Sequence, residues 1–208
     1  MRIPFMSLHD ARKELRYLLN NGYKKKAALE FVSNHYGLSR SDRNILARTT
    51  YADEESAATV AKLAQPSALS GRDLAIDAYN VLITAEAVLF GDPLVCDDGV
   101  IRDDCESGGH YEITGRTDEV LGALNTIFKR HRVASVTFHF DKNVSHSAEH
   151  AAHVSSHSWG VPVRTVLSGQ VDHDLRTTKA VLVATGDYGI IQYLDAYVDI
   201  PRMLLFSW

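Results

Sequence analysis

Apolar positions in the first fifty residues recur with the period of a helix. They fall three and four positions apart at Leu15, Leu18, Leu19, Ala27, Ala28, Phe31 and Val32. Asn21-Gly22 and Gly37 interrupt this pattern, and Ser39 is a favourable residue to cap a helix. The pattern predicts one helix ending at Asn21, a second over residues 24–36 and a third over residues 40–50. This is the outline of a helix-turn-helix unit.

The pattern changes after a polar segment that contains proline and glycine. Residues 51–64 continue as a helix, and the segment 66–72 reads as a linker between a helical domain, 1–65, and a larger domain, 73–208. In the larger domain, short apolar runs alternate with amphipathic segments, which indicates a mostly parallel sheet sandwiched by helices in three layers, an α/β fold of Rossmann type. Strands are expected at 73–77, 134–140, 161–167, 180–184 and, at the sheet edge, 202–208; helices at 78–90, 116–131, 146–158, 171–178 and 188–194; and a hairpin at 93–102.

Charge is divided unequally between the two predicted domains. Residues 1–50 hold ten Lys and Arg against four Asp and Glu, whereas residues 51–208 hold twelve against 22. A basic unit beside an acidic one favours a polyanion partner next to a site that collects cations, although two solvated surfaces would give the same counts. If the helical unit binds nucleic acid, the side chains expected to contact phosphates are Lys24, Lys25, Lys26, Arg40, Arg43 and Arg48.

Composition places the chain among globular proteins of the cytoplasm. No apolar run approaches the roughly 20 residues that span a bilayer, and the segment 1–6 is too short for the apolar region of a signal peptide. The two cysteines, Cys96 and Cys105, fit a reducing compartment, and no second pair is present to form a zinc site.

Carboxylates stand where the predicted strands end. Asp77 follows the apolar run 74–76, Asp141 follows 136–140, and Asp187 follows 180–184. Asp172 opens a helix at the same expected edge of the sheet, since parallel strands end together. Like charges brought together in this way repel, and a divalent cation is the usual remedy; oxygen ligands favour Mg²⁺ or Mn²⁺. The alternative is that each aspartate separately caps a helix.

Four short motifs resemble the NYN branch of PIN-like nucleases, in the same order and with similar spacing over residues 73–195. They are Ile76-Asp77-Ala-Tyr-Asn80-Val, Phe140-Asp141, Val171-Asp172-His-Asp174-Leu and Thr185-Gly-Asp187. Ala78 departs from the family pattern, which has glycine there. Residues 8–50 resemble the helical N-terminal region of uncharacterised prokaryotic proteins in which a domain of unknown function is fused to a PIN-like domain.

The resemblance implies a metal-dependent nuclease site. Asp77, Asp141, Asp172 and Asp187 would hold one or two Mg²⁺ or Mn²⁺ ions, and Asp174 would assist. Asn80 would orient a ligand or substrate.

Other polar residues lie outside these motifs. The loop 97–106 carries further acids, which we interpret as a solvated loop, and Glu86 is a further candidate acid. Histidines at 146, 150, 153 and 157 share a helical stripe. We interpret the stripe as a polar outer face rather than a transition-metal site, with His146 alone a candidate to reach the acids or a phosphate.

The sequence therefore predicts a metal-dependent ribonuclease, with RNA as partner, DNA as a second candidate and a homodimer as one arrangement. Two rival hypotheses remain: a non-catalytic module that binds RNA or protein, and a metal-dependent phosphatase of small molecules.

Overall fold

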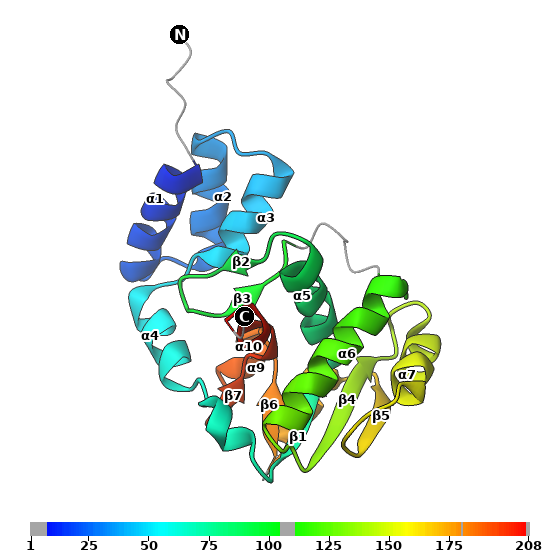
Figure 1. The fold of residues 1–208 in the computed structure, drawn as a ribbon. Coiled ribbons are helices and arrows are strands. Elements are labelled where there is room, and N and C mark those ends of the chain that lie inside the picture. Colours follow the sequence, from blue (N-terminus) through cyan, green and yellow to red (C-terminus); the bar gives the residue numbers. More distant parts are fainter. Residues whose placement is uncertain (1–7, 105–110, 180, 207–208) are drawn as a thin grey trace.

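The structure is a computed structural model that describes residues 8–104, 111–179 and 181–206. Its N-terminal part is helical, shown in blue and cyan in Figure 1. Gly22 and Gly37 follow the first two helices with positive φ angles of 81° and 60°, which glycine adopts without steric cost. Ser39 caps the third helix, accepting a hydrogen bond from the Asp42 N–H at 3.1 Å. The helices are α1 (Leu8–Asn20), α2 (Lys25–His35), α3 (Arg40–Thr49) and α4 (Asp53–Ala61).

A parallel five-stranded sheet occupies the centre of the larger part, with strand order β5-β4-β1-β6-β7. The central strand β1 pairs with β4 on one side and with β6 on the other, so the direction of winding reverses between β1 and β6. Such a switch point is where open α/β sheets bind ligands, beyond the carboxyl ends of the strands. The strands are β1 (Asp73–Asp77), β4 (Ser135–Asp141), β5 (Val163–Ser168), β6 (Leu182–Ala184) and β7 (Tyr197–Val198).

Helices cover both faces of the sheet, so the predicted three-layer α/β fold is confirmed (Figure 1). Leu74 and Ile76 of β1 face a core shared with α5, α6, α7 and α10, whereas Ala75 faces a smaller core shared with α8 and α9. This alternation is the period of a strand buried on both faces. These helices are α5 (Ala78–Phe90), α6 (Gly115–Arg130), α7 (Ser147–Ser156), α8 (Val171–Thr177), α9 (Tyr188–Ile191) and α10 (Ile200–Leu205).

The predicted hairpin is present and contacts the helical part. Its strands are β2 (Leu94–Val95) and β3 (Ile101–Arg102), paired antiparallel. Figure 1 shows α1, α2 and α3 stacked above this hairpin. The Asp97 N–H donates to the carbonyl of Thr49, at the end of α3, at 2.8 Å. The hairpin is therefore the surface through which the helical part joins the sheet.

The prediction of an edge strand over residues 202–208 is wrong, because the described part of that segment belongs to helix α10. Pro201 stands in its first turn, and the Asp199 carboxylate caps it by accepting from the Arg202 N–H at 2.8 Å. Leu204 packs into the core. The edge strand is instead β7, which the sequence pattern did not indicate because only two residues form it.

The connection between the two parts is packed against the sheet. The segment predicted as a linker contains a short 3₁₀ helix, η1 (Pro66–Leu69), whose Leu69 is buried. Just before it, the Ala64 N–H donates to the Tyr197 carbonyl at 2.8 Å, and the Tyr197 N–H donates to the Lys62 carbonyl at 3.0 Å. The chain thus adds main-chain bonds to the β7 edge before it enters β1.

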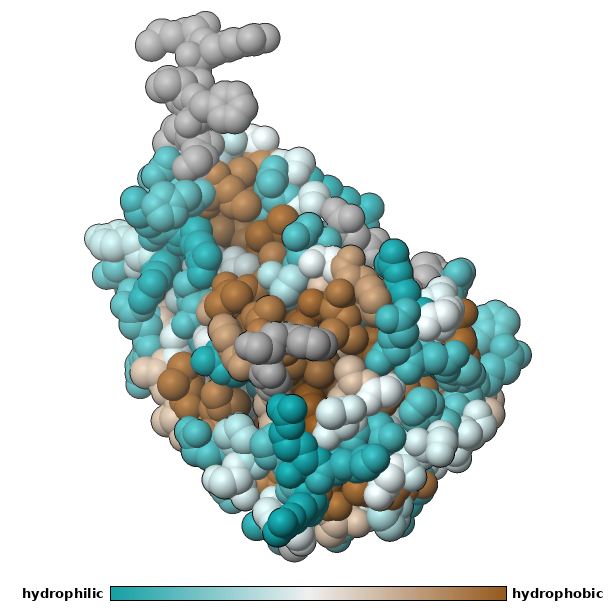
Figure 2. All heavy atoms as spheres, in the orientation of Figure 1, coloured by the Kyte–Doolittle hydropathy of each residue, from teal (hydrophilic) through white to brown (hydrophobic). Residues whose placement is uncertain are grey.

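The surface in this view is divided between hydrophilic and apolar regions. Figure 2 shows hydrophilic residues over α1 and the end of α6, and apolar residues gathered in the middle, around α10. Val60 and Phe206 are more than half exposed. No helix within the described ranges combines the length and the apolar character needed to cross a membrane.

Candidate functional site

The five residues predicted to be catalytic line one cleft of about 290 Å³ at the carboxyl edge of the sheet. Asp77 ends β1 and Asp141 ends β4, while Asn80, Asp172 and Asp187 stand at the starts of helices. The cleft opens at the switch point between β1 and β6. Other described residues that line it are Arg48, Tyr79, Ile83, Asp103, Val144 and Val171.

Asp77 is held by a threonine of the next strand. The Thr185 hydroxyl donates to Oδ2 of Asp77 at 2.9 Å and accepts from the Asp187 N–H at 3.1 Å. Burial raises the pKa of Asp77 to about 7, and the carboxylates of Asp187 and Asp172 raise it as well, against the hydrogen bond from Thr185. The ionised form of Asp77 is therefore disfavoured near neutral pH, and a bound cation would stabilise it.

Asn80 and Asp187 are joined through the intervening loop. The Gly186 N–H donates to Oδ1 of Asn80 at 2.6 Å. A Cβ at Gly186 would lie 3.2 Å from that oxygen and 3.3 Å from the Ile101 carbonyl oxygen, so a side chain there would make these neighbours move by a few tenths of an ångström. Asn80 consequently presents its amide N–H groups as the donors that it can offer a ligand.

Helix capping explains some of the aspartates but not Asp77. Asp187 caps α9 by accepting from the Gly189 N–H at 2.7 Å. Asp141 is held by a turn after β4 instead, where it accepts from the backbone and side-chain nitrogens of Asn143 at 2.8 and 2.9 Å. Asp77 precedes α5 and makes no side-chain cap bond, and the backbone N–H of Asn80 favours its ionised form too weakly to offset burial. Separate helix caps therefore do not explain Asp77, the cleft aspartate whose pKa is raised to about 7.

Asp172 and Asp174 differ in position although both lie in the first turn of α8. Asp172 lines the cleft, is exposed, and lies 3.5 Å from the Arg176 guanidinium. Asp174 accepts a hydrogen bond of 2.5 Å from the Ser168 hydroxyl and is not among the residues lining the cleft. The structure thus places Asp174 beside the site.

The chemistry of the cleft fits Mg²⁺ or Mn²⁺. Its candidate ligand atoms are carboxylate oxygens, and the pKa of Asp77 is raised first by burial and then by the neighbouring carboxylates of Asp187 and Asp172. Among the described residues, no three acidic, histidine or cysteine side chains form a ready-made metal cage. Mg²⁺ commonly takes only one or two carboxylates and completes its shell with water and substrate phosphate. Asp77, with Asp187 and Asp172 beside it, would hold such an ion.

The acidic loop is not solvated, so that interpretation is wrong for its described residues. Asp98 is fully buried and pairs with Arg102 through two bonds of 2.8 and 2.7 Å. Asp103 accepts from the Arg48 guanidinium at 2.8 Å and from the Thr84 hydroxyl at 3.2 Å. The partner of Asp98 is only four positions away, whereas Asp103 pairs with a residue of α3 that is distant in the sequence. Asp97 likewise pairs with Arg12 at 2.5 Å, while Cys105 and Glu106 lie outside the described residues.

The histidine stripe divides among separate environments. His150 is buried and contacts the Tyr79 hydroxyl at 3.0 Å, so the interpretation as an outer face is wrong for it. His153 pairs with Asp118 at 2.8 Å, and His157 packs edge-on against Trp159. His146 is exposed, lies 3.2 Å from Glu149 and does not line the cleft.

The basic residues of the helical part have different exposures. Lys24, Lys26 and Arg40 are exposed, and Arg43 is partly exposed. Lys25 is half-buried, with Nζ 3.5 Å from the centre of the Tyr51 ring, and burial together with Arg102 lowers the pKa of Lys25 to about 8. Arg48 lies in the cleft itself, a position that a helical pattern cannot predict.

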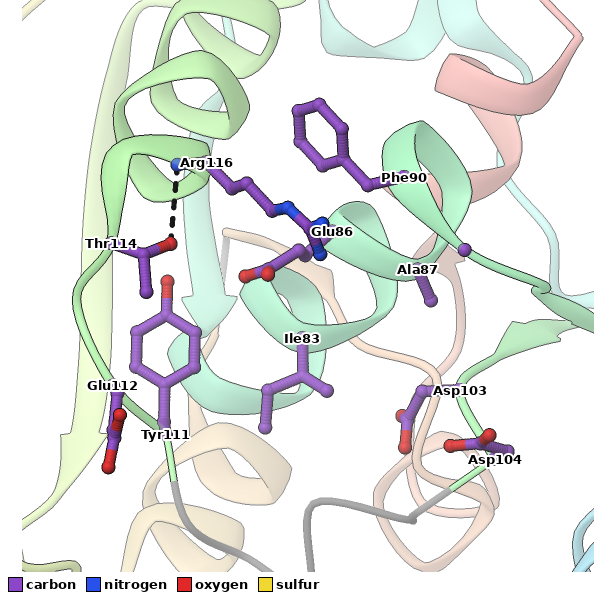
Figure 3. A pocket seen from close by; sticks show the side chains of 11 residues that line it. Ile83, Glu86, Ala87, Phe90, Asp103, Asp104, Tyr111, Glu112, Thr114 and Arg116 are labelled. Carbon is purple, nitrogen blue, oxygen red and sulfur yellow. Dashed lines mark hydrogen bonds between the residues drawn. The ribbon is translucent and has the colours of Figure 1, made fainter.

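A second pocket of about 460 Å³ adjoins the cleft, with Ile83 and Asp103 lining both. Figure 3 shows Glu86 and Arg116 directed into the space between α5 and the segment leading into α6. The candidate acid Glu86 therefore belongs to this neighbouring pocket. Tyr111, Asp104 and Glu112 also line it.

Comparison with known proteins identifies both parts of the chain. Residues 66–203 match the model described as "Domain of unknown function (DUF5616)", and residues 7–62 match the model described as "Protein of unknown function (DUF434)". The chain is 35% identical over 190 residues to the uncharacterized protein MJ0935 of Methanocaldococcus jannaschii, an alignment covering 90% of each. No solved structure matches the chain. With the larger match spanning most of its length, the chain belongs to the DUF5616 family and carries a DUF434 segment at its N-terminal side.

Proposed function

We propose that the protein is a metal-dependent ribonuclease that hydrolyses RNA phosphodiester bonds in the acidic cleft. The observation that carries the proposal is the convergence of Asp77, Asn80, Asp141, Asp172 and Asp187, from separate segments, on one cleft at the switch point. The resemblance of the same residues to the NYN motifs supports it.

The cleft residues have different roles in the proposed reaction. When bound, Mg²⁺ or Mn²⁺ supplies charge neutralisation at a phosphodiester and acidifies water. Asp77 holds the cation in its ionised form, with Thr185 fixing the carboxylate through the 2.9 Å hydrogen bond. Asn80, fixed by Gly186, offers amide N–H groups to a phosphate oxygen. Asp187 and Asp172 add negative charge that favours the cation, and Asp141 lines the same cleft.

The test is cleavage of single-stranded and structured RNA with Mg²⁺ or Mn²⁺. Asp77→Asn and Asp187→Asn should each abolish cleavage, because each removes a charge that would hold the cation. Asp73→Asn is the matched control. It makes the same change at the opposite end of β1, where Asp73 is exposed and accepts from the Ser135 hydroxyl at 2.6 Å; it should cleave like the parent chain.

Other outcomes would identify the rival functions. Cleavage that persists equally in Asp77→Asn and Asp187→Asn contradicts the proposal. RNA binding without cleavage in any metal indicates a binding module on this fold. Release of phosphate from small molecules, with RNA left intact, indicates a phosphatase.

A further inference from the structure

Arg48 brings a positive charge from the helical part into the acidic cleft. It stands in the last turn of α3, and its side chain lines the cleft with Asp77, Asp141 and Asp187. Among the described residues that line the cleft it is the one basic residue. About a quarter of the side chain remains exposed, so a ligand in the cleft can reach it.

The guanidinium of Arg48 is oriented by the larger domain. Its Nη2 donates to Asp103 at 2.8 Å, and Asp103 also accepts from Thr84 of α5 at 3.2 Å. Asp103 is almost fully buried. Because the carboxylate is fixed from α5, the arginine loses little further freedom when it meets a ligand.

The backbone of Arg48 is connected to the loop that carries Asp187. The buried guanidinium of Arg102 donates to the Arg48 carbonyl at 3.5 Å and to the Gly186 carbonyl at 2.9 Å. The same side chain pairs with Asp98 and lies 5.0 Å from the centre of the Tyr51 ring. One side chain therefore sets the position of α3 relative to the acidic residues.

A guanidinium suits this position better than another cation would. It presents five N–H donors in one plane, so it can pair with a carboxylate along one edge and with a phosphate along another. An RNA phosphate entering a cleft with five carboxylates needs compensating positive charge beyond that of a bound ion.

We infer that Arg48 binds a phosphate of the RNA in the cleft, so that the DUF434 segment completes the site of the DUF5616 domain. This rests on the proposed function, and it makes Arg48 a residue of the binding site rather than part of a separate nucleic-acid surface.

The test compares Arg48→Gln with Arg12→Gln in the full chain. Arg12 is the matched control for Arg48. It also joins the helical part to a largely buried aspartate, Asp97, but it does not line the cleft. Arg48→Gln should lower kcat/KM for RNA by on the order of 100-fold, while Arg12→Gln should leave it unchanged. Arg48→Lys should recover part of the loss, since it keeps the charge without the planar donors.

Salt dependence separates phosphate binding from a structural role. The slope of log(kcat/KM) against log[salt] should become shallower by about 0.7 in Arg48→Gln, the value for one contact to single-stranded nucleic acid. Thermal unfolding of both variants shows whether they lose similar stability.

Equal cleavage and equal salt slopes in Arg48→Gln and Arg12→Gln would overturn the inference while leaving the ribonuclease proposal standing. If the parent chain cleaves no RNA in any metal, the proposed function fails, and RNA binding then decides about Arg48. Unchanged affinity and salt slope in Arg48→Gln would overturn the inference in that case too.

Discussion

The ionised carboxylate of Asp77 lowers the stability of the folded protein. Its folded-state pKa of about 7 lies well above the ordinary value of 3.8, because burial and two neighbouring carboxylates oppose ionisation. The folded protein thus binds more protons than the unfolded chain between about pH 4 and pH 7. The contribution of Asp77 to stability therefore falls as pH rises through that window and is lost above it. Such a cost is expected where a site requires charge.

Asp77→Asn should stabilise the protein at pH 8 and change little at pH 5, where Asp77 is protonated. The expected gain at pH 8 is about 2 kcal/mol, or roughly 4–8 °C in Tm. Thermal unfolding at the two pH values measures it, with Asp73→Asn as the control that lacks the pH-dependent gain. An equal shift at both pH values would refute the electrostatic explanation.

Binding of a divalent cation should offset the destabilisation caused by ionised Asp77. At pH 7.5, Mn²⁺ at 100 times its dissociation constant should stabilise the parent chain by about 2.7 kcal/mol. The same Mn²⁺ concentration should stabilise it less at pH 5.5, because protons compete for Asp77 and weaken the binding of the ion. Asp77→Asn should lose this stabilisation, and calorimetric melts with and without Mn²⁺ check it. A cation effect of the same size in the variant would show that the ion binds elsewhere.

Individual site residues could be predicted because parallel strands end at one edge of a sheet. All five residues predicted to be catalytic line the cleft: Asp77, Asn80, Asp141, Asp172 and Asp187. The residue pattern alone does not separate Asp172 from Asp174, and only the resemblance to the NYN motifs gives Asp174 the assisting role. Two residues apart on a helix, the side chains point in different directions, and only the position of Ser168 shows where Asp174 is directed.

The elements around the cleft depend on close backbone packing. The β6–α9 connection passes so near α5 and β3 that a Cβ at Gly186 would lie only 3.2–3.3 Å from its neighbours. The Asn80 amide and the Ile101 carbonyl determine this distance, and the carbonyl, being backbone, cannot rotate away.

Gly186→Ala should therefore destabilise the protein by about 1–3 kcal/mol, the usual cost of overpacking. Gly122→Ala is the matched control: it lies within α6 with open space around its Cβ position, and it should stabilise by about 1 kcal/mol through helix propensity. Urea unfolding of the two variants measures both effects. Stabilisation by both substitutions would contradict the close approach at Gly186.

Element boundaries were predictable where local chemistry is unambiguous. The expected β1 and α5 agree with the structure because an apolar run ends at a carboxylate and a continuous helical pattern follows. The C-terminal segment was misassigned because a short apolar run suits a strand or a buried helix equally. The Asp199 cap and Pro201 in the first turn favour a helix in this segment.

Across the whole molecule, the helical part and the sheet share buried polar contacts. Arg102 is bonded to Asp98, to the Gly186 carbonyl and to the Arg48 carbonyl. With Lys25 over the Tyr51 ring, these contacts form a polar junction beneath the hairpin. We expect the two parts to unfold together.

Arg102→Met should cost about 3–5 kcal/mol, because it leaves the buried Asp98 carboxylate without its partner. Adding Asp98→Asn should recover part of that loss by removing the uncompensated charge. Far-UV circular dichroism and tryptophan fluorescence should report one coincident transition for the parent chain. Two separated transitions would show that the parts are independent.

The junction was beyond sequence reasoning. Arg48 and Asp103 are 55 positions apart, and Arg12 and Asp97 are 85 apart. Charge counts suggested a basic unit and an acidic unit with separate partners. Some of those opposite charges instead neutralise one another across the junction, which no single-chain periodicity can reveal.

The central place of β1 in the sheet has a consequence for synthesis. The hydrogen bond between Asp77 and Thr185 joins residues 108 positions apart, so the ribosome must add most of the larger domain before the cleft can close. Folds with such distant contacts form late and slowly. On the proposed function, a growing chain has no complete site until the ribosome has added Asp187.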